Sequence, residues 1–483
     1  MKQSVFTQFI LYRYRYGIGY GLFLIALVAL LYVVGAFTPG MLTNAEMQSA
    51  VVSANIQFNT LSIIDLPYHL LQKVSIDVLG LTPFAIKLPS LLLAAATGIG
   101  LLFLLRRWFK QNVAVLASII AVTAGQFLIL AQNGTSMIML LFWPTILLLL
   151  ATTVSAKPEY TFGRKLCFFV AAALSLYTPL SIYALIAMLC AALFHPHLRY
   201  MLLHLTRWKV ALSAVAGIVI LLPLIWYGAQ SPSQLTTILG IPQDISWASI
   251  IGNLQQLLSV FFGFASPGIH GTVLTPMYGF GTMSLIVLGL LRLAVDHHSA
   301  RTYTIGLWLV ILSVFLVLQP SFIAITFVPL LLMLAIGIDT LFREWYGLFP
   351  RNPYARAAAL IPLVILISSI VFTGLDRYMN SYNYHPAIAK DFTNDLQLLR
   401  EQLTADQKQV LLTSPEEKSF YALLSRSYPL LTVVSDGKKI TTAKQVIATV
   451  AADRASFAEK PPQRIITNHF TQNNLRFYIY KTE

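Results

Sequence analysis

The chain has 483 residues, of which 57% are hydrophobic and only 11% charged, and its formal net charge is +14. Soluble globular proteins carry about 25% charged residues, so the composition excludes a water-soluble protein and indicates that lipid surrounds most of the chain. The basic excess lies in short loops between apolar runs, where Lys and Arg set membrane orientation. We therefore predict membrane lipid as a partner and no nucleic acid.

Apolar runs of membrane-spanning length follow one another along most of the chain. The first comes after Lys2, Arg13 and Arg15 and has no small-residue cleavage site, which predicts an uncleaved helix. Cys167 and Cys190 lie inside such runs, where we expect small apolar residues and no metal or disulfide. About eleven transmembrane helices are expected, near residues 17–37, 84–105, 113–131, 137–154, 166–177, 180–194, 210–228, 277–295, 303–318, 321–341 and 357–375.

The connecting loops alternate in basic charge. One set is rich in Lys and Arg, as at residues 106–110, whereas the other holds only Lys73 and Lys87, and its loop at residues 229–276 has no Lys or Arg. The positive-inside rule then places the N-terminus in the cytoplasm and the tail, residues 376–483, outside. We predict an integral protein of the cell (plasma) membrane.

Two parts are expected: a transmembrane part, residues 1–375, and an extracytoplasmic α/β domain, residues 376–483. The long outer loops at residues 38–83 (loop one) and 229–276 are of a length that is usually functional. In the tail, alternating apolar residues predict strands at 410–412, 431–434, 464–467 and 476–480. Helices are predicted there at residues 390–403 and 440–452.

Most of the acidic residues that we expect outside the cytoplasm before residue 376 lie in loop one. Asp65, His69, Lys73 and Asp77 are spaced four residues apart, which predicts one polar face of an amphipathic helix at the membrane surface. This face is either the wall of an active site or a solvated face stabilised by ion pairs between neighbouring turns. The one other acid expected outside in this part of the chain is Asp244, in the second long loop.

Glu46 also has two interpretations. Thr43 and Glu46 have the spacing of a capping box, in which the carboxylate satisfies an amide at the start of its own helix. Alternatively, Glu46 is a general base in a cleft at the lipid boundary.

Several short motifs follow one another in a fixed order: Ala45-Glu46, Asp65-Leu66-Pro67-Tyr68-His69, Gly80, Lys87-Leu88-Pro89-Ser90 and Gln319-Pro320-Ser321-Phe322. Their order and spacing resemble the membrane-embedded GT-C glycosyltransferases, above all the dolichyl-phosphate-mannose protein mannosyltransferase and aminoarabinose transferase group. That pattern has an Asp-Glu pair, a Lys- or His-Pro-Pro segment, a Gly, Arg-Leu-Pro-Ser and a late Arg-Tyr-x-x-Pro helix. Here Ala45, Asp65, Lys87 and Ser321 replace the first acid, the Lys or His and the two arginines.

The resemblance implies an inverting transfer of a sugar from a polyprenyl-phosphate donor to an extracytoplasmic acceptor. It implies Glu46 as the base, with Asp65 as a second catalytic candidate. For substrate binding it implies His69, with Lys73, Lys87 and Arg377 as the cations available to a lipid phosphate. A divalent metal is an option that the resemblance leaves open.

Two other classes remain. The fold is compatible with a catalytically degenerate scaffold that binds a lipid-linked glycan or assembles a partner. A transporter is less well supported, because the spans lack intramembrane ion pairs and an inverted repeat.

Overall fold

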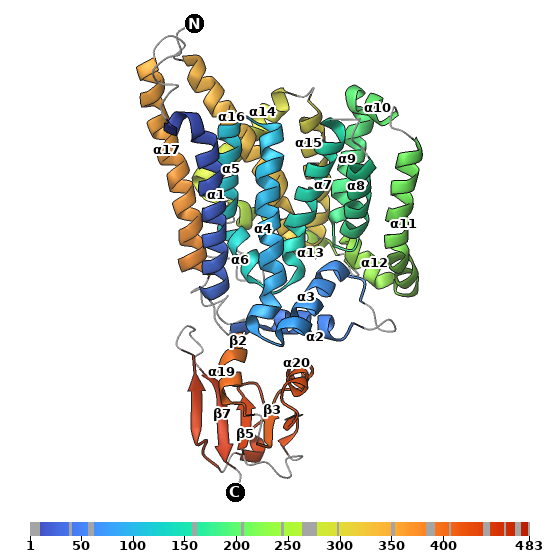
Figure 1. Cartoon of the computed structure of the whole chain (residues 1–483), viewed down its shortest axis with the longest axis vertical. Helices are drawn as coiled ribbons and strands as arrows, with labels where there is room; N and C mark the ends of the chain where they lie inside the picture. The colour runs from blue at the N-terminus through green and yellow to red at the C-terminus, as the bar shows by residue number, and fades with distance from the viewer. Residues whose placement is uncertain are drawn as a thin grey trace.

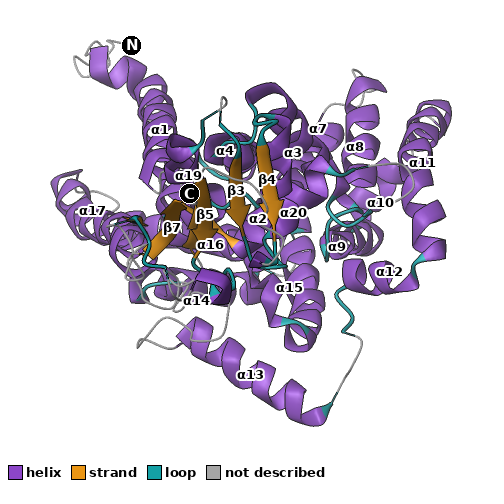
Figure 2. Ribbon diagram, turned by 90° about the horizontal axis from the view of Figure 1, so that it is seen from below, coloured by secondary structure: helices purple, strands orange, loops and turns teal. Residues whose placement is uncertain are grey.

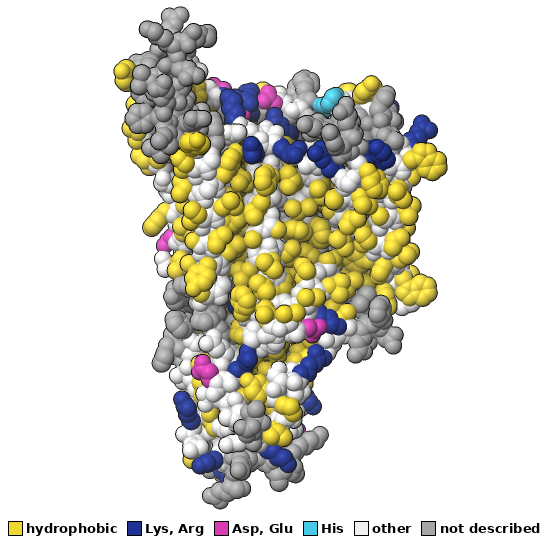
Figure 3. All heavy atoms as spheres, in the orientation of Figure 1, with side chains coloured by type: hydrophobic (Ala, Val, Ile, Leu, Met, Phe, Trp, Pro, Cys, Tyr) yellow, Lys and Arg dark blue, Asp and Glu magenta, His cyan; other side chains and the backbone are white. Residues whose placement is uncertain are grey.

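The computed structural model describes residues 10–37, 41–56, 62–156, 162–203, 207–242, 246–262, 278–296, 299–348, 353–382, 392–404, 407–437, 445–457, 460–468 and 475–481. A bundle of helices forms most of the molecule, and a small sheet lies beyond one of its ends (Figure 1). The face of the bundle seen in Figure 3 is largely apolar. This is the surface that a lipid environment requires.

Seven helices in the described part of the chain are long and apolar enough to cross a membrane, two of them continuing a short 3-10 turn. An eighth span results if α5 (Gln111–Thr123) and α6 (Gly125–Gln132), which meet at 54°, cross together. The seven contain α1 (Ile10–Phe37), α4 (Pro83–Trp108), η3 with α7 (Ser136–Ile138, Met139–Ala156), α11 (Arg207–Gln230), α15 (Ala300–Leu318), η4 with α16 (Pro320–Thr326, Phe327–Leu348) and α17 (Pro353–Asp376).

Every predicted apolar run coincides with a helix or a helix pair. Three of these helices are short, however: α8 (Phe162–Ser175) and α9 (Ser181–Phe194) have 14 residues each, and α14 (Phe280–Val295) has 16. A span needs about 20 residues, so the count of eleven stays a prediction. The remaining helices of this part are α10 (Pro196–Leu203), α12 (Pro232–Leu239) and α13 (Trp247–Phe262).

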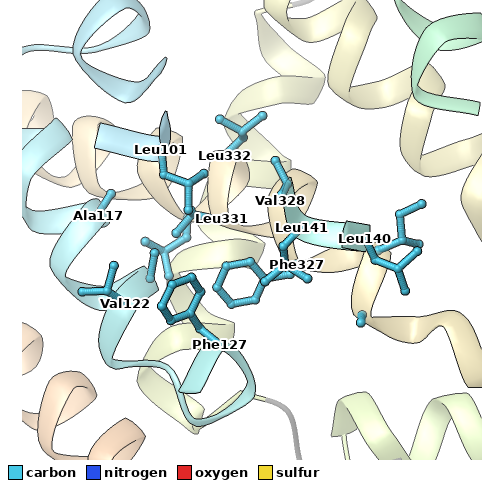
Figure 4. Packing of buried hydrophobic residues seen from close by; sticks show 14 of the residues in the cluster. Leu101, Ala117, Val122, Phe127, Leu140, Leu141, Phe327, Val328, Leu331 and Leu332 are labelled. Carbon is cyan, nitrogen blue, oxygen red and sulfur yellow. The ribbon is translucent and has the colours of Figure 1, made fainter. Parts of the chain in front are cut away.

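The main core lies where α4 to α7, α14 and α16 meet. Phe127 stacks on Phe327 there, with ring centroids 6.3 Å apart (Figure 4). Gly289 of α14 and Gly337 of α16 face each other's helix, and a Cβ on either would collide with a carbonyl of the partner helix. Small residues thus let two membrane helices approach at backbone distance.

Loop one folds as a strand and two helices: β1 (Met41–Thr43), α2 (Asn44–Ala54) and α3 (Leu66–Leu79). On α3, Tyr68, Gln72 and Ser75 are buried, whereas Val74 and Val78 are more than 60% exposed. The buried face therefore includes polar side chains, and large apolar side chains are exposed. Exposed apolar side chains suit a helix lying at the lipid boundary, and that location stays a prediction.

The tail contains a five-stranded mixed sheet in the order β4-β3-β5-β7-β6. β3 pairs in parallel with both β4 and β5, and β7 runs antiparallel to β5 and β6. Its strands are β3 (Gln409–Leu412), β4 (Leu431–Val434), β5 (Gln445–Thr449), β6 (Arg464–Thr467) and β7 (Leu475–Lys481). The helical elements of the tail are α19 (Leu396–Gln402), α20 (Lys418–Tyr421), η5 (Arg377–Tyr382), η6 (Ala422–Arg426) and η8 (Ala455–Phe457).

All four predicted strands of the tail are confirmed, but the two predicted helices need correction. Residues 445–449 form the central strand β5, because Val446, Ile447 and Ala448 are buried on both faces of the sheet. Such a strand has a continuous apolar run without alternation, which a short sequence window cannot distinguish from a helix. Residues 392–395 form β2 (Phe392–Asp395), and α19 begins only after it.

β2 pairs antiparallel with β1, so the tail is joined to loop one by backbone hydrogen bonds. One buried cluster also contains side chains of both parts, including Leu42, Met47, Ile86, Leu396 and Phe477. Seen from the tail side, the sheet lies over α2 and α4 and leaves α8 to α12 to one side (Figure 2). The tail is thus packed against the segment that holds the candidate site.

Candidate functional site

Glu46 lies in the first turn of α2 and is fully buried. Its Oε2 accepts hydrogen bonds from the Thr43 backbone N–H at 2.8 Å and from the Thr43 hydroxyl at 3.1 Å, while the Glu46 N–H donates back to Thr43. The capping box predicted from the sequence is therefore formed. Because Oε2 is turned onto its own helix, Oε1 is the oxygen left for other chemistry.

Oε1 of Glu46 is also occupied. It accepts a hydrogen bond of 2.7 Å from the Gly134 N–H and lies 3.6 Å from the Nζ of Lys87. Lys87 is only 3% exposed and also donates to the carbonyl of Met41 at 3.1 Å. The sequence predicted both charged residues as site candidates, and the structure brings them together as a buried ion pair.

Asp65 is held in a different way. It is the residue before α3, has a left-handed backbone (φ 53°) and makes no side-chain cap hydrogen bond. Oδ2 accepts a 2.7 Å hydrogen bond from the Ser136 hydroxyl, whereas Oδ1 is buried without a well-formed hydrogen bond in the described part of the chain. Burial raises the pKa of Asp65 to about 6, against the opposing effect of the Ser136 and Thr178 hydroxyls.

The predicted polar face of α3 is therefore wrong at its first member. Asp65 lies outside the helix, since its backbone leaves the helical region one residue before α3 starts. His69 and Lys73 follow on the helix, and Asp77 is exposed. No salt bridge within α3 joins these residues among those that the structure describes, so the stabilising ion pairs of the alternative interpretation are not formed either.

Buried polar side chains gather around the turn at residues 134–136, which both Glu46 and Asp65 contact. Gln72 donates through Nε2 to the carbonyls of Ile86 and Gly134, both at 3.0 Å. Tyr68 shares a 2.8 Å hydrogen bond with Ser90. Burial raises the pKa of the Tyr68 hydroxyl, and the negative charges of Glu46 and Asp65 raise it further. The two acids thus lie on either side of the turn that contains Gly134 and Ser136. This set lies at the end of the bundle that the sequence predicts to face outward, and we call Glu46, Asp65, Tyr68, Gln72, Lys87 and Ser90 the outer polar layer.

His69 is oriented by α2. Ser53 donates its hydroxyl proton to Gln72 Oε1 at 2.7 Å, so it must accept the proton of His69 Nδ1, which lies 2.8 Å away. The imidazole is then protonated on Nδ1 and presents the lone pair of Nε2. Burial lowers its pKa to about 4, which keeps the ring neutral at pH 7.

Two predicted cations lie elsewhere. Lys73 donates to the carbonyl of Ile56 at 3.1 Å, at the side of α3 that faces the end of α2. Arg377 lines a separate cavity of about 320 Å³ between α5, α14, α16 and α17. The outer acid Asp244 lies outside the described residues. Among those that are described, no group of three His, Cys, Asp or Glu side chains could hold a metal ion.

A second cavity, of about 530 Å³, lies against Lys87, where the ends of α1 and α4 nearest the tail meet it. Sequence reasoning did not find its tail residues, nor Ser136, Gln72 and the backbone of Gly134. Their signal was absent from the sequence, because each acts through a contact with a residue that is distant along the chain, 88 positions for Gly134 and Glu46.

Comparisons with known proteins show similarity in sequence over part of the chain and in fold over most of it. A family model for dolichyl-phosphate-mannose-protein mannosyltransferases matches residues 67–227. The structure of ArnT from Cupriavidus metallidurans bound to undecaprenyl phosphate superimposes with a TM-score of 0.54 over 95% of this chain and 97% of that one, at 12% identity. The apo oligosaccharyltransferase from Archaeoglobus fulgidus gives a TM-score of 0.53 over 90% of this chain and 66% of that one, also at 12% identity.

A search of curated protein sequences gives no match. The chain nevertheless has the fold of the GT-C membrane glycosyltransferases over almost its whole length, and the resemblance predicted from its motifs is confirmed.

Proposed function

We propose that the protein is a membrane glycosyltransferase that moves a sugar from a polyprenyl-phosphate donor to an acceptor outside the cytoplasm. The observation that carries the proposal is the outer polar layer, which keeps two buried carboxylates and a buried lysine in a full-length GT-C fold. The undecaprenyl phosphate bound to ArnT supports this class of carrier.

Asp65 is the better placed of the two acids to act as base. A general base works best when its pKa is near the working pH, and burial raises that of Asp65 to about 6. Its Oδ2 accepts from Ser136, whereas its Oδ1 has no well-formed hydrogen bond among the described residues. In the proposed step Asp65 takes the acceptor hydroxyl proton, the acceptor oxygen bonds to the sugar C1, and the C1–O bond to the phosphate breaks.

Lys87 is assigned to the leaving phosphate. A departing polyprenyl phosphate needs a fixed positive charge, and Lys87 is fixed by Glu46 and by the Met41 carbonyl. Glu46 is then a positioning residue, and its predicted role as base is kept as the alternative to be tested. The proposed transfer uses only side chains of this chain.

The proposed orientation puts the N-terminus in the cytoplasm and the outer polar layer and tail outside the cell membrane. It is supported by a row of Lys and Arg side chains at the end of the bundle opposite the tail (Figure 3). That row is the expected signature of the cytoplasmic side.

One observation favours the catalytically degenerate scaffold instead. Both carboxylate oxygens of Glu46 are engaged, and Ala45 stands where the resembled pattern has its other acid. A scaffold would still bind a polyprenyl-phosphate sugar but would not turn it over.

The deciding experiment measures sugar transfer by the purified protein in liposomes, with a panel of polyprenyl-phosphate sugars and extracts of envelope lipids and glycans as acceptors. We expect release of polyprenyl phosphate that depends on an acceptor and on Asp65. Saturable donor binding without release across the whole panel would support the scaffold and overturn the proposal.

A further inference from the structure

The cavity of about 530 Å³ at the membrane boundary is built by two parts of the chain that are far apart in sequence. Its size lies within the range of about 300–1,000 Å³ of small-molecule sites. We call it the boundary pocket. It is lined by Gly35, Thr82, Pro83, Phe84, Lys87 and Leu91 from the α1 and α4 side and by Gln397, Arg400, Glu401 and Tyr428 from the tail.

The two halves differ in chemistry. The membrane half is mostly apolar and includes Phe84, which is 55% exposed, with Lys87 as its one charged group among the lining residues. The tail half has an arginine, a carboxylate, an amide and a phenol. A cavity that is apolar toward the bilayer and polar toward the tail is complementary to an amphiphile whose headgroup lies at the membrane surface.

The halves are held in register by the β1–β2 ladder. Met41 of β1 pairs with Asp395 of β2, and the Met41 carbonyl accepts the hydrogen bond from Lys87. Asp395 in turn caps α19 by accepting from the Leu398 N–H at 3.1 Å, and α19 carries Arg400 in its last turn. A single short ladder therefore fixes both the lysine and the helix that bears the arginine.

We propose that the boundary pocket binds the phosphate-bearing headgroup of a membrane lipid, and that the tail supplies Arg400 and Tyr428 to it. The guanidinium matches two phosphate oxygens and Lys87 adds a second positive charge. The Tyr428 ring gives a flat apolar surface for a sugar, and Gln397 and Glu401 offer partners for its hydroxyls. This inference rests on the proposed function, since it makes the tail part of the lipid-phosphate site.

The experiment measures binding of undecaprenyl phosphate to the full-length protein in phosphatidylcholine nanodiscs. Loss of one charge-assisted contact weakens binding by about tenfold or more, so Arg400→Gln should do so, while Arg400→Lys keeps part of the affinity. The matched control is Arg464→Gln, which changes an exposed arginine of β6 that does not line the pocket. Glu401→Gln should tighten binding, an effect that misfolding cannot imitate.

Two competitors identify the source of the phosphate. Undecaprenol, which has the chain without the charge, should bind much more weakly, and inorganic phosphate should compete only poorly. Equal binding of undecaprenol, full displacement by millimolar phosphate, or unchanged affinity in both Arg400→Gln and Glu401→Gln would each overturn the assignment. Wild-type binding of undecaprenyl phosphate without sugar transfer would support the boundary pocket and contradict the proposed enzymatic function. Sugar transfer by the wild type, together with an unchanged affinity of the Arg400→Gln variant, would support the enzymatic function and contradict the pocket.

Discussion

The N-termini of α2 and α3 differ in how they accommodate a buried acid. Each helix begins in loop one, and each buries an acid at its start. At α2 the cap residue Thr43 is extended, the capping box is complete, and Glu46 also meets Lys87 and the Gly134 N–H. At α3 the cap residue is Asp65 itself, in a left-handed conformation and without a cap hydrogen bond.

The contrast separates an acid that stabilises the fold from one that costs it free energy. The hydrogen bonds and the ion pair of Glu46 compensate its burial. A left-handed non-glycine residue and an incompletely paired buried carboxylate both cost free energy, and such features persist where the surrounding structure enforces them, often at functional sites. The comparison predicts that neutralising the two acids has opposite effects on stability.

The largest effect is expected from Asp65→Asn. As the general base, Asp65 is worth about 10²–10⁴-fold in rate, so transfer should fall by that factor. Stability should rise, because the difference between a pKa of 3.8 and about 6 corresponds to about 3 kcal/mol at most of charge burial that the amide avoids. Donor turnover in liposomes and thermal unfolding in detergent measure the two effects.

Asp77→Asn is the matched control for this prediction, since Asp77 is an exposed acid on the same helix. It should change neither rate nor stability. An active Asp65→Asn variant would return the base to Glu46, and an inactive variant with reduced thermal stability would mean that Asp65 is structural.

Lys87→Met is expected to have the largest effect on folding. Removing one partner of a buried ion pair leaves an uncompensated charge, which costs about 3–5 kcal/mol. The carboxylate of Glu46 would then lack its only salt-bridge partner among the described residues. The measurement is the unfolding midpoint in detergent, compared with that of Lys73→Met, because Lys73 donates only to the Ile56 carbonyl among the described residues. Equal midpoints in the two variants would show that the Glu46–Lys87 pair contributes nothing specific.

Glu46→Gln should reduce the stability less than Lys87→Met does. Glutamine serves at the third position of a capping box as glutamate does, so the helix start is kept, but Lys87 no longer faces the negative charge of Glu46. A buried group left imperfectly paired costs about 1–3 kcal/mol, so the unfolding midpoint should fall while the rate stays within about tenfold of the wild type. A loss of 10²-fold or more with an unchanged midpoint would instead make Glu46 the base.

The sequence predicted those features that depend on local pattern. The apolar runs, the Thr43–Glu46 capping box and four strands of the tail are each encoded within a few residues. The membership of the site was predicted only in part, because it depends on contacts between distant segments. Nothing near Glu46 in the chain indicates that its second oxygen meets Lys87 and Gly134, 41 and 88 positions away.

Asp65 also shows that the local sequence pattern does not reveal tertiary contacts. Its spacing to His69 fits a helix, and only the packing of residues 134–136 and 177–178 against it reveals that its backbone is left-handed. Arg377 was grouped with the other cations because the predicted topology puts it outside, yet it lines a different cavity on the α17 side. Topology assigns a residue to one side of the membrane and does not specify its neighbours there. The division at residue 375 stays a prediction, and the shared cluster of loop one and the tail couples the two parts.

The smallest and most specific effect is the pH dependence of Asp65. If Asp65 is the base, kcat/KM should rise with pH through a midpoint near 6, so that the rate at pH 5 is about tenfold below its plateau. Stability should move the other way. A carboxyl whose pKa is raised on folding binds more protons in the folded state, so the free energy of unfolding decreases as pH rises from about 4 to 6 and then levels off. Asp65→Asn should remove both slopes, while Asp77→Asn should keep them. A wild-type rate that is flat between pH 5 and 7, in a protein that still loses stability over that range, would show that Asp65 titrates without taking the acceptor proton.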